Sequence, residues 1–217
     1  GSGSGAGGGV PVTGFIEALQ EEGFSVNPNL VTFYKDNNKS GPGRGSAPGN
    51  GNVSPGYNTG ETPVANYTTE LEATYDQYGD AAIVVFSRIS GEGFDLPRTM
   101  MWDGQTYKGW NANSTQPVPG ARDKYDHYLQ LDQNESDLLK YLGEHFDNVI
   151  VLLNTGSQFE VGFLDDPGHY GYHENVKGCI WMGYPGSSGN LAVAKALKGE
   201  INPSGCTVDT WARDCKN

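Results

Sequence analysis

The stretch "AAIVVFSRISGEGFD", from Ala81 to Asp95, decides the fold and places the candidate chemistry. Its first seven residues form an unbroken apolar run with several β-branched side chains. Such a run is typical of a strand covered on both faces, and strands of this kind belong to parallel sheets. A loop follows in which one carboxylate, Glu92, stands between Gly91 and Gly93. The stretch therefore predicts a buried strand with an ionisable side chain just beyond its carboxyl end.

Three further segments are predicted to be strands. "NVIVLLNTG" (148–156) and "VKGCIWMGYPG" (176–186) are apolar runs bounded by turn residues, as buried strands are. "LVTFYKD" (30–36) alternates enough to predict a short strand near the start of the chain. Two long segments rich in turn residues, 36–57 and 91–126, are expected to be loops.

Four helices are predicted between these strands. The clearest is Leu131–Phe146, where Asp132 is a good N-cap, Glu135 completes a capping box and Leu131 precedes as a hydrophobic staple. The others are Val12–Gly23 with Thr13 as N-cap and Gly23 at the C′ position, a weak helix over Thr68–Asp80, and Ser188–Glu200.

The alternation of helices and strands predicts an α/β fold. We expect one layered sandwich domain over residues 1–217, with a mainly parallel sheet and helices on both faces. The first glycine-rich loop and helix have no strand before them, so the chain is expected to begin inside a domain, after its first strand. In such sheets the working edge lies beyond the carboxyl ends of the strands. Glu92 is expected there, at the end of a central strand.

Composition excludes several classes of function. The 217 residues include 36% hydrophobic and 18% charged residues, which indicates a packed core with polar loops. The formal net charge of −12 repels phosphate backbones, so nucleic acid is not an expected partner. No apolar run approaches the ~20 residues that span a membrane.

Cysteine and histidine spacing predicts no metal site, and no cofactor is expected. The odd count of 3 cysteines makes no disulfide framework; pairing of Cys206 with Cys215 and two free thiols stay open alternatives. No Cys-x-x-Cys is present. His169 and His173 are four residues apart, but Gly171 between them argues against a shared helical face.

Each candidate residue has a functional and a structural interpretation. Glu92 is either a proton donor with a raised pKa or a solvated loop acid. Arg88 either orients Glu92 and its loop, or forms a structural ion pair with Asp95 or another acid.

Two other features allow similar alternatives. The aromatic residues Trp102, Tyr107 and Trp110 suit stacking on sugar rings or a small core under a long loop. The glycine run at residues 1–9 lacks the lysine of a phosphate-binding loop, which favours a flexible loop or linker.

Several segments together resemble glycoside hydrolase family 3, the family of many β-glucosidases. "GYPGSSGNLAVAKALKGEINPSG" is similar to the family's Pro-Gly loop, helix and closing turn, and "VVFSRISGEGFD" resembles its acid/base loop. "GSGSG" with "FIEALQEEGFSVN", "LQLDQNESDLL" and "NVIVLLNTGSQFEV" match in order, so the resemblance spans nearly the whole chain. It departs from the family after Asp95, where Leu96 and Pro97 replace the usual Arg.

The resemblance implies one domain of a retaining β-glycosidase, most readily a β-glucosidase. This chain would be the α/β sandwich that supplies the general acid/base, Glu92, while the nucleophilic Asp lies on a (β/α)8-type barrel domain absent from the chain. Phe94 would form an apolar wall on the aglycone side, and Arg88 would be the second substrate-site residue. The implied partners are a β-linked oligosaccharide or glycoside and the barrel.

The resemblance also implies that the chain alone is inactive. A non-catalytic carbohydrate-binding or scaffolding module is the alternative function. The compartment stays undetermined, with an extracellular or cell-surface location slightly favoured.

Overall fold

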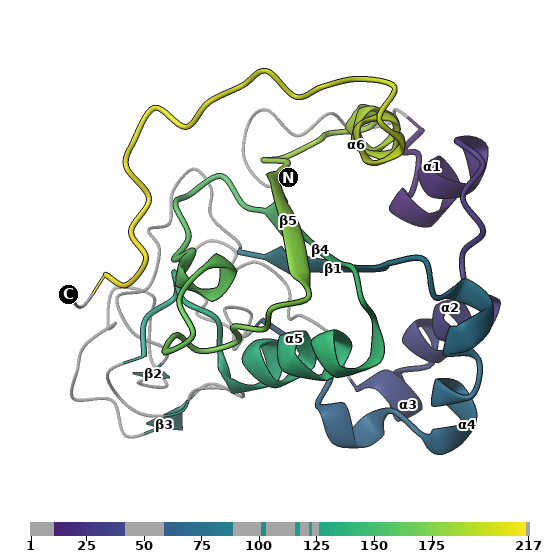
Figure 1. Ribbon diagram of the computed structural model, residues 1–217, viewed down its shortest axis with the longest axis horizontal. Helices are drawn as coiled ribbons and strands as arrows, with labels where there is room; N and C mark the ends of the chain where they lie inside the picture. Colours follow the sequence, from purple (N-terminus) through teal and green to yellow (C-terminus); the bar gives the residue numbers. More distant parts are fainter. Residues whose placement is uncertain are drawn as a thin grey trace.

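A computed structural model describes residues 11–41, 59–88, 101–102, 116–117, 122 and 126–215 (Figure 1). The helices are α1 (Phe15–Glu21), α2 (Pro28–Lys35), α3 (Asn37–Ser40), α4 (Thr69–Glu72), α5 (Gln133–His145) and α6 (Gly189–Lys198), with 3-10 helices η2 (Val64–Asn66), η3 (Tyr75–Tyr78) and η5 (Gly162–Leu164). The strands are β1 (Ala82–Ser87), β2 (Met101–Trp102), β3 (Gln116–Pro117), β4 (Val149–Asn154) and β5 (Val176–Trp181). Within these ranges, no helix combines the length and the apolar character needed to cross a bilayer.

The central sheet is parallel and has the strand order β1-β4-β5. β1 pairs with β4 from Ala82 opposite Val149 to Ser87 opposite Asn154, without a break. β4 pairs with β5 through a register shift at Val149/Ile150. Because the strands are parallel, their carboxyl ends meet at one edge of the sheet, as expected for an α/β fold.

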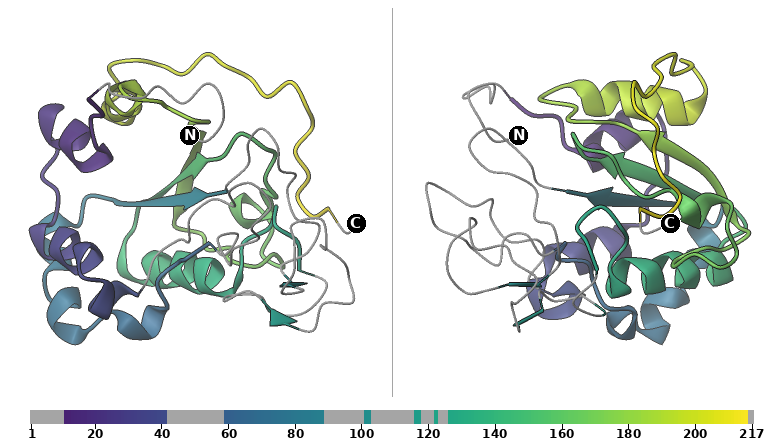
Figure 2. Two further views of the ribbon diagram at one scale, coloured as in Figure 1. Left: turned by 180° about the vertical axis from the view of Figure 1, so that it is seen from behind. Right: turned by 90° about the vertical axis from the view of Figure 1, so that its left-hand side faces the viewer.

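Helices cover both faces of this sheet, which confirms the predicted layered sandwich (Figure 2). The helix α5 packs on the face that carries Val84, Val151 and Leu153. The helices α1 and α6 pack against each other over the opposite face, where Ile83 meets the small cluster around Ala18 and Ala194.

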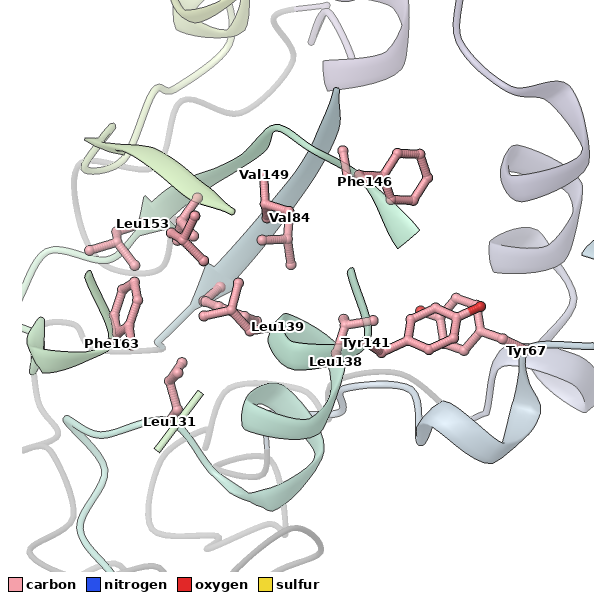
Figure 3. Packing of buried hydrophobic residues seen from close by; sticks show 14 of the residues in the cluster. Tyr67, Val84, Leu131, Leu138, Leu139, Tyr141, Phe146, Val149, Leu153 and Phe163 are labelled. Carbon is pink, nitrogen blue, oxygen red and sulfur yellow. The ribbon is translucent and has the colours of Figure 1, made fainter. Parts of the chain in front are cut away.

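The main core lies between α5 and the sheet (Figure 3). Leu139 of α5 and Val149 and Val151 of β4 are each fully removed from solvent. Leu138, Leu153 and Phe163 pack around them, and aromatic side chains extend the cluster towards Tyr67 and Tyr141. Burying one aliphatic side chain of this size contributes about 1.5–3 kcal/mol to the stability of the fold. The layer of such side chains therefore holds α5 on the sheet.

The predicted start of α5 is confirmed in detail. The backbone N–H of Glu135 donates to Asp132 Oδ1 at 2.8 Å, and the N–H of Asp132 donates to Glu135 Oε2 at 3.0 Å. This reciprocal pair is the capping box that the sequence indicated. The end of α1 was also predicted correctly, since Gly23 follows the C-cap residue Glu22 and adopts φ +90°, but Gly14 replaces Thr13 as the N-cap.

The predicted strand at residues 30–36 is wrong, because this segment forms α2. Asn27 Oδ1 accepts hydrogen bonds from the N–H groups of Asn29 and Leu30, and Pro28 occupies the first helical position. Cap and proline together start a helix, and Phe33 on its inner side reaches the core. In so short a segment, the spacing of apolar residues does not distinguish the 3.6-residue repeat of a helix from the two-residue repeat of a strand.

The helix predicted over Thr68–Asp80 is only partly present, as α4 followed by η3. The Thr74 hydroxyl donates to Leu71 O at 2.6 Å and accepts from Asn27 Nδ2 at 2.7 Å. Side-chain bonds of this kind compete with the helical hydrogen-bond ladder, and here they mark its interruption.

The prediction that β1 is a central strand is wrong for the described part of the chain, and the predicted cover on both faces is only partial. β1 lies at the edge of the sheet, and Val85 is 37% exposed. The apolar run fits β4 better, where Val151, Leu152 and Leu153 are all buried.

Candidate functional site

The carboxyl edge of the sheet brings together the ends of all three parallel strands. Arg88 follows β1, Thr155 follows β4 and Met182 follows β5. The Arg88 N–H donates to Asn154 O at 3.2 Å, and the Met182 N–H donates to Leu153 O at 3.0 Å, so the pairing continues to this edge. The segment predicted to carry the catalytic carboxylate follows Arg88 in the sequence and lies outside the described residues.

The side chain of Arg88 is held in the core by five hydrogen bonds. Its Nη1 and Nη2 atoms donate to the two carboxylate oxygens of Glu135 at 2.6 and 2.7 Å. The remaining N–H groups donate to the carbonyl oxygens of Ser87 at 3.0 Å, Tyr128 at 2.5 Å and Gln130 at 2.7 Å. All five guanidinium N–H groups are therefore used within the protein.

Aromatic packing and charge complete the surroundings of Arg88. The guanidinium carbon lies 4.7 Å from the ring centre of Phe159, and the residue is 1% exposed. Burial alone lowers the pKa of Arg88, but the Glu135 carboxylate outweighs it and the pKa is raised. Of the two predicted roles, this geometry favours a structural ion pair, with Glu135 as the partner.

Acidic groups around this ion pair have perturbed pKa values. Burial raises the pKa of Glu61 to about 8, opposed by a hydrogen bond from the N–H of Thr62 and reinforced by the charges of Glu135 and Asp132. Burial and the Glu135 charge also raise the pKa of Asp132 to about 6. Since one arginine faces three carboxyl groups, protonation of Glu61 relieves the excess negative charge.

Glu92 and Phe94 lie outside the described residues, as do Tyr107, Trp110 and Asp95. Trp102 is the second residue of β2, where its backbone lies opposite Gln116 of β3. Of the three predicted site residues, the structure therefore describes only Arg88, and the substrate-site roles of Glu92, Phe94 and Arg88 remain predictions.

An aromatic surface at the same edge was not anticipated from the sequence. Trp181, the last residue of β5, is 44% exposed and donates from Nε1 to Thr155 O at 2.7 Å. It packs edge-on against Trp211, with ring centres 5.3 Å apart. Tyr184 is exposed nearby and lies over Gly156, where a Cβ atom would meet its ring at 2.5 Å. The available signal was the position of Trp181 at the carboxyl end of a predicted strand.

A second group of polar side chains gathers where the C-terminal segment meets the segment after β4. His127 Nε2 and His169 Nε2 lie 2.6 and 3.6 Å from the two carboxylate oxygens of Glu160. The N–H of Cys215 donates to Glu160 Oε1 at 2.8 Å. Although burial alone raises the pKa of Glu160, the contacts with the two histidines hold it well below its usual range. The sequence predicted no metal site, but His127, Glu160 and Cys215 offer metal-ligand atoms that lie within 4.8 Å of one another.

An open hollow of about 500 Å³ lies at the opposite edge of the sheet. Its lining includes Asp80, Asp147 and Asn175, which come just before β1, β4 and β5. This is the amino-terminal edge, and its lining is mostly polar, so it is a poor candidate for the site of chemistry.

Comparison with known proteins agrees with the fold. The family model of the glycosyl hydrolase family 3 C-terminal domain matches residues 1–217. A β-glucosidase from Ruminococcus albus is 27% identical over 221 residues, which covers 98% of this chain and 19% of that protein. β-Glucosidase A from Butyrivibrio fibrisolvens is 31% identical over 136 residues, or 62% of this chain and 15% of that protein.

A crystal structure supports the same assignment. That of a novel β-glucosidase from Paenibacillus barengoltzii matches with a TM-score of 0.62 and 25% identity, covering 99% of this chain and 20% of that one. The chain therefore spans about a fifth of the length of the relatives that match its full extent. By its match from end to end, the chain belongs to glycosyl hydrolase family 3, as the C-terminal domain of that family.

Proposed function

We propose that this chain is the part of a retaining β-glycosidase, of β-glucosidase type, that supplies the general acid/base. Glu92 protonates the leaving oxygen of a β-linked glycoside and then deprotonates the attacking water. An Asp on a (β/α)8-type barrel domain of the same enzyme attacks the anomeric carbon. Relatives named as β-glucosidases support the reaction class.

One observation carries the proposal for Glu92. Its loop begins four residues earlier at Arg88, and the Arg88 side chain is fixed by Glu135 in the core. The residue that precedes the predicted loop is thus anchored, and the sequence places Glu92 between Gly91 and Gly93, the residue type with the widest choice of backbone conformations. An acid/base that meets its nucleophile across two domains needs both properties, since retaining enzymes hold the two carboxyl groups about 5–5.5 Å apart.

In this arrangement Arg88 is a positioning residue. All of its N–H groups are occupied within the chain, so it acts on the substrate through the loop that follows it. Phe94 forms the apolar wall beside the aglycone.

The test compares Glu92→Ala with the parent in the intact enzyme. Hydrolysis of cellobiose, whose leaving group needs protonation, should fall by about 10²–10⁴-fold, the usual contribution of general acid–base catalysis. Aryl glycosides with good leaving groups should lose less, and azide should restore turnover by forming a glycosyl azide. Glu144→Gln, an exposed change on α5, serves as the control and should leave both rates unchanged. Parent-like cellobiose hydrolysis by Glu92→Ala would refute the assignment.

A second candidate function is a carbohydrate-binding module, favoured by the exposed Trp181 and Tyr184 at the carboxyl edge. Titration of the chain alone with cello-oligosaccharides, followed by tryptophan fluorescence, separates the two. Micromolar binding that Trp181→Ala abolishes would favour the module. If the chain instead supplies only the acid/base of a larger enzyme, we expect neither a fluorescence response nor hydrolysis by the chain alone.

A further inference from the structure

The C-terminal segment crosses the molecule and ends against the segment that follows β4. After α6 it runs to the far side of the fold (Figure 1). There the N–H groups of Val161 and Gly162 donate to the carbonyl oxygens of Ala212 and Arg213 at 3.1 Å each. These two bonds place Cys215 next to Glu160, which lies 55 positions away in the sequence.

The side chains that meet there form a mixed set of nitrogen, oxygen and sulfur donors. His127, Glu160 and Cys215 are the one group of three or more such residues found together in the described ranges. Thiolate with imidazole selects zinc or a similar borderline divalent ion, whereas calcium and magnesium prefer oxygen ligands alone. The donor set therefore identifies the class of ion.

His169 lies beside this group and is a candidate fourth ligand. Its Nδ1 lies 2.9 Å from Tyr170 O, which fixes the proton on Nδ1 in the neutral ring and leaves the Nε2 lone pair facing Glu160 Oε2 at 3.6 Å. A ring nitrogen bonded to a backbone carbonyl is the usual outer support of a metal-bound histidine. The ring also packs on Gly162, where a Cβ atom would approach it at 2.3 Å.

We propose that His127, Glu160 and Cys215, with His169 as the fourth ligand, bind one zinc ion that fastens the C-terminal segment to the core. Bond lengths of about 2.0–2.3 Å in a tetrahedral site separate the ligand atoms by about 3.3–3.6 Å. His127 Nε2 is buried without an aligned hydrogen-bond partner, and it must move from 2.6 Å to that separation from Glu160. Cys215 loses its thiol proton to solvent as the zinc–sulfur bond forms, without any change of oxidation state.

One local bond is given up in this exchange. The N–H of Leu129 now approaches His127 Nδ1 at 3.3 Å, and ligation through Nε2 requires the proton on Nδ1 instead. That contact is long for a hydrogen bond, so its loss is a small cost beside that of forming a zinc–nitrogen bond. A modest rotation of the ring separates the two groups.

The test is titration of the metal-free protein with Co²⁺, a spectroscopic substitute for zinc. One equivalent should produce visible bands of tetrahedral cobalt and a thiolate-to-cobalt charge-transfer band, both displaced by Zn²⁺. Cys215→Ser should abolish the charge-transfer band and weaken Zn²⁺ binding at least tenfold. Cys215 is exposed, so this variant is expected to fold. Glu160→Gln should also weaken binding.

Cys206→Ser is the matched control, because Cys206 is an exposed cysteine of the same segment outside the cluster. It should bind Co²⁺ and Zn²⁺ as the parent does. Three results overturn the proposal: no cobalt spectrum in the parent, a charge-transfer band that survives Cys215→Ser, or equal loss in Cys206→Ser and Cys215→Ser.

Discussion

Arg88 binds both carboxylate oxygens of Glu135, at 2.6 and 2.7 Å, and so joins the end of β1 to the first turn of α5. Both side chains are buried, with 0% and 2% of their surfaces exposed. Removing one partner leaves an uncompensated charge in the core.

We expect Arg88→Met to lower the free energy of unfolding by about 3–5 kcal/mol, measured by urea denaturation. The double variant Arg88→Met/Glu135→Leu should recover part of this loss, because the carboxylate that pairs directly with Arg88 is removed together with it. Lys195→Met, which removes an exposed contact with Glu22 at 3.9 Å, should change stability by about 1 kcal/mol or less. Equal losses in the two arginine-deficient proteins would show that the stabilisation does not come from pairing.

Leu139 anchors α5 on the sheet, and it is fully buried. Leu139→Ala should reduce the free energy of unfolding by about 2–5 kcal/mol through lost burial and a residual cavity. The neighbouring Lys140→Ala, on the exposed side of the same helix, should be within about 0.5 kcal/mol of the parent. Thermal unfolding followed by circular dichroism measures both; a near-neutral Leu139→Ala would mean that this layer is loosely packed.

Alanine substitutions at Gly171 and Gly183 distinguish the cost of backbone strain from the cost of side-chain crowding. Both have positive φ, +82° and +58°, but a Cβ atom at Gly171 would lie 2.7 Å from Leu131 Cδ1, whereas none of the described atoms lies within 4 Å at Gly183. Gly183→Ala should cost about 1 kcal/mol from the backbone alone. Gly171→Ala should cost a further 1–3 kcal/mol or so from overpacking. Denaturant titration of the two variants tests the difference, which should vanish if Leu131 moves aside freely.

Glu61 makes stability depend on pH. Its pKa is raised from 4.5 to about 8, so the folded state holds this proton more tightly than the unfolded chain. The resulting stabilisation is complete below pH 4.5 and is lost as pH rises to about 8. Stability should therefore fall between pH 6 and 8, and Glu61→Gln should flatten that slope.

The difference between variant and parent isolates Glu61. The pKa of His169 is raised by its contact with Glu160, which adds a slope of the same sign, and Asp132 adds one below pH 6. Glu21→Gln, an exposed change on α1, should keep the parental slope. Urea midpoints at several pH values provide the measurement, and parallel curves for Glu61→Gln and the parent would contradict the prediction.

Local signals predicted much of the fold. Asp132 and Glu135 marked the start of α5, and apolar runs located β4 and β5. Both signals depend only on residues that are close together in the sequence. The segment of α2 was wrongly predicted to be a strand, because seven residues are too few to show a clear repeat of apolar positions. The signal for a helix is the Asn27 cap followed by Pro28. The edge position of β1 depends on strand order, which no single segment encodes.

The candidate site was less accessible from sequence. Arg88 was noticed, but its partner lies 47 residues away and was identified only by the packing of α5 on β1. The grouping of His127 and Cys215 around Glu160 is also tertiary, since no short spacing relates them. Residues of ordinary type become a site only after the chain brings them together.

The position of β1 also affects how the chain behaves when it is produced alone. Among the described residues β1 is hydrogen-bonded to β4 on one side, and no described strand lies on its other side. Val85 adds an exposed apolar side chain to β1. Exposed apolar side chains on a strand favour strand-to-strand aggregation, so Val85→Lys is expected to improve the solubility of the isolated chain without disturbing the α5 face.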